Sequence, residues 1–129
     1  KYGGAFKVTD GLLEKFGEDR VVDTPVSEAA IVGSSFGAAV TGLVPVVDMH
    51  FADFVTCAMD EVANQIAKSR YMFGGQLDCP LTLRMPYGIG KSGGGAGLTP
   101  ILVEGGQGVR REGGALAADA HAVVAHPVG

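Results

Sequence analysis

The sequence predicts an α/β domain built in three layers, with a parallel β-sheet between helices on both faces. Two observations lead to this class. Short runs rich in Val, Leu and Met alternate with longer segments whose apolar residues recur at helical spacing. The turns that join these segments are short and contain glycine or proline, which favours parallel strands connected by right-handed helical crossovers.

The first predicted element is a short helix over residues 9–17. Thr9 or Asp10 can cap its start, and Gly17 provides a C-terminal stop. Residues 20–24 then form a short β-branched strand, which the next residue, a proline, ends. The chain therefore begins with a helix followed by a strand.

The next helix is predicted over residues 28–41, with Ser27 as its cap and Gly42 as its end. Small residues fill most of this helix, so it can lie very close to a neighbouring element. Residues 44–49 form the second predicted strand.

A long helix is predicted over residues 51–73, where two glycines stop it, and a third strand over residues 80–85. One face of the long helix is expected to carry the apolar residues Val55, Met59, Val62 and Ile66. In parallel sheets of this class, ligands bind at the carboxyl ends of the strands. This rule places residues 24–28, 50–54 and 87–95 around one potential site.

The glycine-rich stretch after the third strand contains Gly90-Lys91-Ser92 and invites comparison with a phosphate-binding P-loop. A P-loop needs a glycine five positions before Gly90, where this chain has Met85. It also needs a helix that starts at the Lys-Ser pair and holds the anion, but several glycines and Pro100 follow instead. The nucleotide-binding interpretation is therefore weak, and a glycine-rich loop at a strand end remains.

Composition narrows the possible functions further. The 129 residues are 47% hydrophobic and carry a net charge of −4, which fits one globular domain and argues against a nucleic-acid partner. No apolar run of about 18 residues and no export leader occurs, so we expect neither a membrane span nor secretion. Cys57 and Cys79 lack metal-ligand spacing and are expected to be buried free thiols. The dispersed histidines make a zinc site improbable.

Four segments in a fixed order resemble a known family. They are Phe6-Lys7-Val8-Thr9-Asp10-Gly11-Leu12, Asp23-Thr24-Pro25-Val26-Ser27-Glu28, His50-Phe51-Ala52-Asp53-Phe54 and Arg70-Tyr71-Met72-Phe73-Gly74-Gly75-Gln76. Together they resemble the β subunit of thiamine-diphosphate-dependent 2-oxo acid dehydrogenases, the E1 component of the pyruvate, branched-chain and acetoin dehydrogenase complexes. The resemblance covers residues 1–96 and corresponds to the transketolase-like pyrimidine-binding domain.

The resemblance assigns roles to two residues. Glu28 matches the glutamate that hydrogen-bonds N1′ of the cofactor's aminopyrimidine and favours its imino tautomer, which can take the proton from the thiazolium carbon. Without the resemblance, Glu28 would be interpreted as a first-turn helix glutamate that the helix dipole favours. Phe54 matches the aromatic residue that stacks on the pyrimidine ring. Phe51 is expected to be ordinary core, and Tyr87 a packing residue at the rim.

The resemblance also implies partners. The diphosphate and its Mg²⁺ are held by a Gly-Asp-Gly to Asn motif of the E1 α subunit, and no Gly-Asp-Gly occurs here. A second β subunit and the lipoyl-bearing E2 component complete the expected assembly, in the bacterial cytoplasm or the mitochondrial matrix. The lone chain would provide only half of the thiamine-diphosphate site, so we expect it to be neither a tight cofactor binder nor an active enzyme.

Residues 97–129 depart from the family pattern and form a divergent, glycine-rich distal part. The family's His-Ser-Gln stretch is replaced by residues 97–104, and no aromatic residue follows Tyr87. His121 and His126 are expected to lie in a small-residue helix or tail and not to substitute for the missing histidine. The family's second domain is also absent from these residues. The alternative function is therefore a truncated, non-catalytic pairing domain of the same fold.

Overall fold

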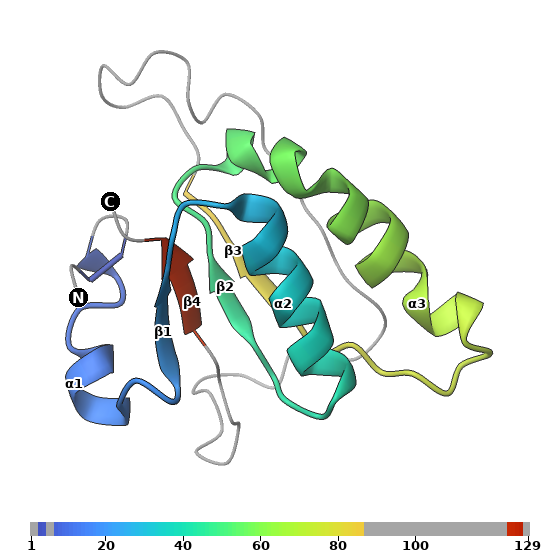
Figure 1. The fold of residues 1–129 in the computed structure, drawn as a ribbon, viewed down its shortest axis with the longest axis horizontal. Helices are drawn as coiled ribbons and strands as arrows, with labels where there is room; N and C mark the ends of the chain where they lie inside the picture. Colours follow the sequence, from blue (N-terminus) through green and yellow to red (C-terminus); the bar gives the residue numbers. More distant parts are fainter. Residues whose placement is uncertain (1–2, 5–6, 87–123, 128–129) are drawn as a thin grey trace.

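A parallel sheet forms the centre of the described structure, a computed structural model that covers residues 3–4, 7–86 and 124–127, with β4 described by its backbone. Within these residues the strand order is β1-β4-β2-β3 and all pairs are parallel (Figure 1). The strands are β1 (Val21–Thr24), β2 (Val46–Asp48), β3 (Thr82–Arg84) and β4 (Val124–Pro127). The predicted α/β class with its parallel sheet is confirmed, and the three predicted strands form within their expected ranges.

Strand β4 lies between β1 and β2 and was not predicted. It pairs with β1 on one side and with β2 on the other, so it joins two parts of the sheet that do not touch each other directly. His126, expected in a helix or tail, lies in this strand opposite Asp23 of β1. That expectation was wrong because the pairing is supplied by distant strands and not by the local sequence. His121 and the rest of the stretch 97–123 lie outside the described residues.

The first helix, α1 (Leu12–Phe16), is shorter than predicted. Its N-cap is Gly11 at φ 78°, whose carbonyl accepts a hydrogen bond from the Lys15 amide at 3.1 Å. The predicted start at Thr9 or Asp10 is therefore wrong, because the left-handed turn at Gly11 separates those residues from the helix. The predicted stop at Gly17 is confirmed: this residue also has φ 78°, and its amide donates to the Leu13 carbonyl at 2.9 Å.

Helix α2 (Glu28–Val40) connects β1 to β2. Ser27 is its N-cap as predicted, with extended backbone, although its side chain makes no capping hydrogen bond. The expected very close approach of this helix to a neighbour is not seen at its glycines. A Cβ atom on Gly33 would lie 3.5 Å from Cγ of Glu61, an ordinary van der Waals distance, and one on Gly37 would have no neighbour within 4 Å.

The predicted long helix is confirmed as one helical segment, but its winding changes along its length. It comprises the 3₁₀ helix η2 (Ala52–Ala58), the π-helix η3 (Glu61–Ile66) and α3 (Ala67–Met72). The expected apolar face includes Met59, yet Met59 is 41% exposed and Ala58 is fully buried. A 3₁₀ turn has about three residues instead of 3.6, which shifts the buried position by one residue. Among the described helices, none has the length and apolar character needed to cross a bilayer.

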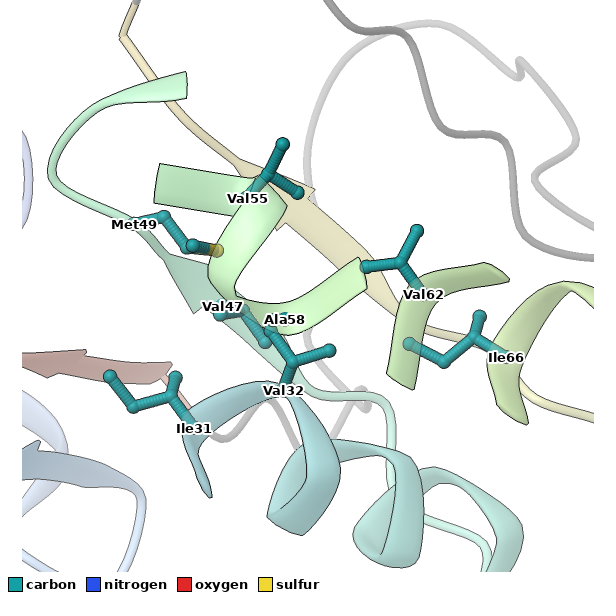
Figure 2. Packing of buried hydrophobic residues seen from close by; sticks show 8 residues of the cluster. All are labelled: Ile31, Val32, Val47, Met49, Val55, Ala58, Val62 and Ile66. Atoms are coloured by element: carbon teal, nitrogen blue, oxygen red, sulfur yellow. The ribbon is translucent and has the colours of Figure 1, made fainter. Parts of the chain in front are cut away.

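The core lies between α2, β2 and the two helices that follow β2, η2 and η3 (Figure 2). Its eight residues are Ile31, Val32, Val47, Met49, Val55, Ala58, Val62 and Ile66. Apolar side chains from the first half of α2, from the end of β2 and from η2 and η3 thus meet in one cluster. This cluster fixes the strand ends that carry the candidate site.

Candidate functional site

The carboxyl ends of β1, β2 and β3 lie at one edge of the sheet, and α2 and η2 begin there (Figure 1). Register places Asp48, the last residue of β2, opposite Arg84, the last residue of β3. The Ala52 amide, at the start of η2, donates to the Pro86 carbonyl at 3.1 Å. Two of the three predicted rim segments, residues 24–28 and 50–54, are therefore at this edge. The third, 87–95, lies outside the described residues, as does Tyr87.

Glu28 is the first residue of α2, four residues after Thr24 ends β1, and is half-buried. Pro25 prevents β1 from continuing, and the extended Ser27 then starts the helix, with its carbonyl accepting from the Ile31 amide at 3.0 Å. A carboxyl group is thereby held at a helix N-terminus beside the sheet edge. The position predicted for Glu28 from the strand-end rule is the position it takes.

Phe51 and Phe54 form an exposed aromatic pair where the chain passes from β2 into η2. Their ring centroids are 6.3 Å apart and the rings meet edge to face, at 72°. Phe54 is 44% exposed and Phe51 is 36% exposed. The expectation that Phe51 is ordinary core is therefore wrong. The buried positions of this turn are taken by Ala52 and Val55, which leaves both rings available to a flat ligand.

Asp48 and Arg84 were not predicted as part of the site. Their side chains form an ion pair, with the Asp48 side chain 1% exposed and that of Arg84 31% exposed. The sequence carries one usable signal for this pair: each residue is a single charge that ends an otherwise apolar strand. Only knowledge of the strand register shows that the two charges face each other.

The described residues contain no group of three or more His, Cys, Asp and Glu side chains arranged to hold a metal ion. His50, the residue before the aromatic pair, is half-buried. The described part of the candidate site thus consists of one half-buried carboxyl group, two exposed aromatic rings and an ion pair with a buried Asp48 and a partly exposed Arg84. These groups can bind a flat heteroaromatic ring and exchange a proton with it.

The two cysteines differ in their surroundings, which corrects the expectation that both are buried. Both are free thiols, but Cys57 is exposed and Cys79 is partly buried. Burial raises the pKa of the Cys79 thiol above its ordinary value, so less thiolate is present at a given pH. We expect iodoacetamide at pH 8 to alkylate Cys57 before Cys79, as followed by peptide mass spectrometry. Equal rates in the native protein, with denatured protein as the control, would contradict this assignment.

Comparison with known proteins identifies the domain. Residues 2–95 match the family model described as "Transketolase, pyrimidine binding domain". The chain belongs to this family. The resemblance inferred from the four sequence segments is thereby confirmed at the level of the domain, and the matched region contains Glu28, the aromatic pair and the Asp48–Arg84 pair.

The similar curated proteins are subunits of 2-oxo acid and acetoin dehydrogenases. The acetoin:2,6-dichlorophenolindophenol oxidoreductase subunit β of Bacillus subtilis is 49% identical over 69% of this chain and 26% of its own length. The 2-oxoisovalerate dehydrogenase subunit β of the same organism is 47% identical over 70% of this chain and 28% of its own length. The pyruvate dehydrogenase E1 component subunit β of Staphylococcus epidermidis is 51% identical over 68% of this chain and 27% of its own length. The transketolase pyrimidine-binding domain found here thus spans about a quarter of each of these relatives.

Proposed function

We propose that this chain supplies the pyrimidine-binding half of a thiamine-diphosphate site in an E1 component. The reaction would be oxidative decarboxylation of a 2-oxo acid, with transfer of the acyl group to a lipoyl carrier. The observation that carries the proposal is the presence of a half-buried Glu28 and an exposed Phe51–Phe54 pair at the same edge of the sheet. The similarity to β subunits of two 2-oxo acid dehydrogenases and of an acetoin oxidoreductase supports it.

The residues at this edge fit the aminopyrimidine chemically. Thiamine diphosphate, when bound, supplies the thiazolium carbon that attacks the 2-oxo acid. Glu28 would hold a proton at N1′ of the aminopyrimidine, because a carboxyl group can both donate a hydrogen bond to a ring nitrogen and accept the proton back. Phe54 would cover one face of the pyrimidine ring and exclude water from it.

The proposal requires a second chain for the other half of the cofactor. An E1 α subunit would hold the diphosphate and its Mg²⁺, a second β subunit would join the assembly, and a lipoyl-bearing E2 component would accept the acyl group. The proposed location is the bacterial cytoplasm or the mitochondrial matrix. The lone chain would have neither tight cofactor binding nor turnover.

A Phe54→Ala variant tests the cofactor-binding part of the proposal. Loss of the stacking ring is expected to raise the Kd for thiamine diphosphate about tenfold in the complex assembled with the α partner, because such a contact contributes about 1 kcal/mol or more. Titration calorimetry with thiamine diphosphate measures the change directly.

Phe16→Ala is the matched control for this experiment. Phe16 is 45% exposed, close to the 44% of Phe54, but it lies on α1. It should leave the Kd unchanged. A Phe54→Ala complex that binds as tightly as the Phe16→Ala complex would remove Phe54 from the site.

A second candidate function is a non-catalytic pairing domain that keeps the fold and has lost turnover. It is favoured by the exposed apolar side chains at the end of α3, where Tyr71 is 91%, Met72 66% and Phe73 56% exposed. An apolar cluster of this kind fits a protein partner. If the unaltered chain assembles with an α partner but gives no turnover and no thiamine-diphosphate binding, this second function is the correct one.

A further inference from the structure

The Asp48–Arg84 ion pair lies at the strand ends from which the chain continues into the aromatic segment, Phe51 to Phe54. Asp48 ends β2 and Arg84 ends β3, and the two face each other in the sheet register. The side chain of Asp48 is 1% exposed, so its charge is almost fully removed from water. A buried pair of this kind contributes little net stability, but removal of one partner leaves an uncompensated buried charge. The role of the Asp48–Arg84 pair is therefore to hold the groups around it in one arrangement.

The second carboxylate oxygen of Asp48 faces the N-terminal segment. Both Asp48 Oδ2 and Thr9 Oγ1 are buried and lack a hydrogen-bond partner among the described residues. A Cβ atom on Gly4 would lie 2.5 Å from Asp48 Oδ2 and 2.6 Å from Thr9 Oγ1, so both oxygens pack around the same glycine. Gly4 has φ +68°, and the Thr9 amide donates to the Gly3 carbonyl at 2.9 Å. The N-terminal segment is thus folded onto the carboxylate of Asp48.

The same strand ends hold the aromatic segment. The Met49 amide, next to Asp48, donates to the Arg84 carbonyl at 2.8 Å. Three residues later the Ala52 amide donates to the Pro86 carbonyl at 3.1 Å. The Phe51–Phe54 segment therefore begins just after Asp48, which is paired with Arg84 of β3 and packs beside Gly4 of the N-terminal segment.

We propose that Asp48 is a positioning residue for the aromatic segment. Through Arg84 it links the end of β2 to the end of β3, and its second oxygen packs beside Gly4. It thereby holds Phe54 at the edge where Glu28 starts α2, and it sets the affinity of this edge for a flat heteroaromatic ring. The ring-binding part of this inference rests on the proposed function, whereas the positioning part rests on the geometry alone.

Amide hydrogen exchange of the full chain in complex with its α partner tests the positioning part without cofactor. In Asp48→Asn, the Met49 and Ala52 amides are expected to exchange about tenfold faster, because the partly buried Arg84 loses its charged partner at the strand ends. The Thr82 amide, which donates to the Pro45 carbonyl at 3.0 Å at the other end of the same strands, is the internal control and should not change. If all three amides accelerate equally, Asp48 only stabilises the fold and the proposal fails.

Thiamine-diphosphate titration of the same complexes tests the ring-binding part. Asp48→Asn is expected to raise the cofactor concentration for half-saturation about tenfold, with a smaller fall in kcat. An unchanged half-saturation in Asp48→Asn would overturn the link to binding. If the unaltered complex does not bind thiamine diphosphate while the exchange pattern is observed, the proposed function fails and the positioning role stands.

Discussion

Replacement of Glu28 by Gln is expected to lower the turnover of the assembled dehydrogenase by about 10²–10⁴-fold, the usual contribution of a positioned acid–base group. Glutamine has nearly the same shape and can still donate a hydrogen bond to N1′ of the pyrimidine, but it cannot give up or take a proton. The loss should therefore appear in kcat, with a much smaller change in the Kd for thiamine diphosphate. Steady-state kinetics of the complex reconstituted with the α partner measure it.

Glu14→Gln provides the control for the charge change. Glu14 is exposed on α1, so its replacement should leave turnover within about twofold of the unaltered complex. Unaffected turnover in Glu28→Gln would show that the assignment of Glu28 is wrong. An inactive unaltered complex would instead favour the non-catalytic pairing domain.

Met49→Ala is expected to destabilise the domain by about 3 kcal/mol, the typical cost of truncating a buried methionine in a close-packed core. Met49 is 1% exposed and lies in the cluster between β2, α2 and η2 (Figure 2). Because this cluster holds the strand ends, the variant should also lose cofactor binding on mild warming. Urea unfolding followed by circular dichroism measures the change in the free energy of unfolding.

The matched control is Met59→Ala, in the helical segment that follows Met49 along the chain. Met59 is 41% exposed, so its truncation should cost no more than about 0.5 kcal/mol. Equal losses for the two variants would mean that the core cluster does not hold the domain together. A larger loss of stability for Met59→Ala than for Met49→Ala would contradict the finding that Ala58, and not Met59, is the buried residue of this turn.

Much of the fold was predictable because it depends on local sequence patterns. The three strands and the helices between them follow from apolar spacing, caps and glycine stops, and the placement of residues 24–28 follows from the rule that ligands bind at strand ends, whereas the role of Glu28 came only from the family resemblance. The exposure of the Phe51 and Met59 side chains was not predictable. Both residues flank η2, whose 3₁₀ winding does not follow from the local sequence pattern. The Asp48–Arg84 pair required the register of two strands that are far apart in sequence.

Strand β4 was the largest omission, and its physical reason is also its main consequence. Residues 124–127 form a strand through their pairing with β1 on one side and β2 on the other. During synthesis, the first three strands leave the ribosome well before this strand does. Until β4 is made, β1 and the β2–β3 pair have unpaired inner edges that can join to other chains. The order of the strands therefore makes the nascent domain vulnerable to aggregation for the time needed to translate the segment between β3 and β4.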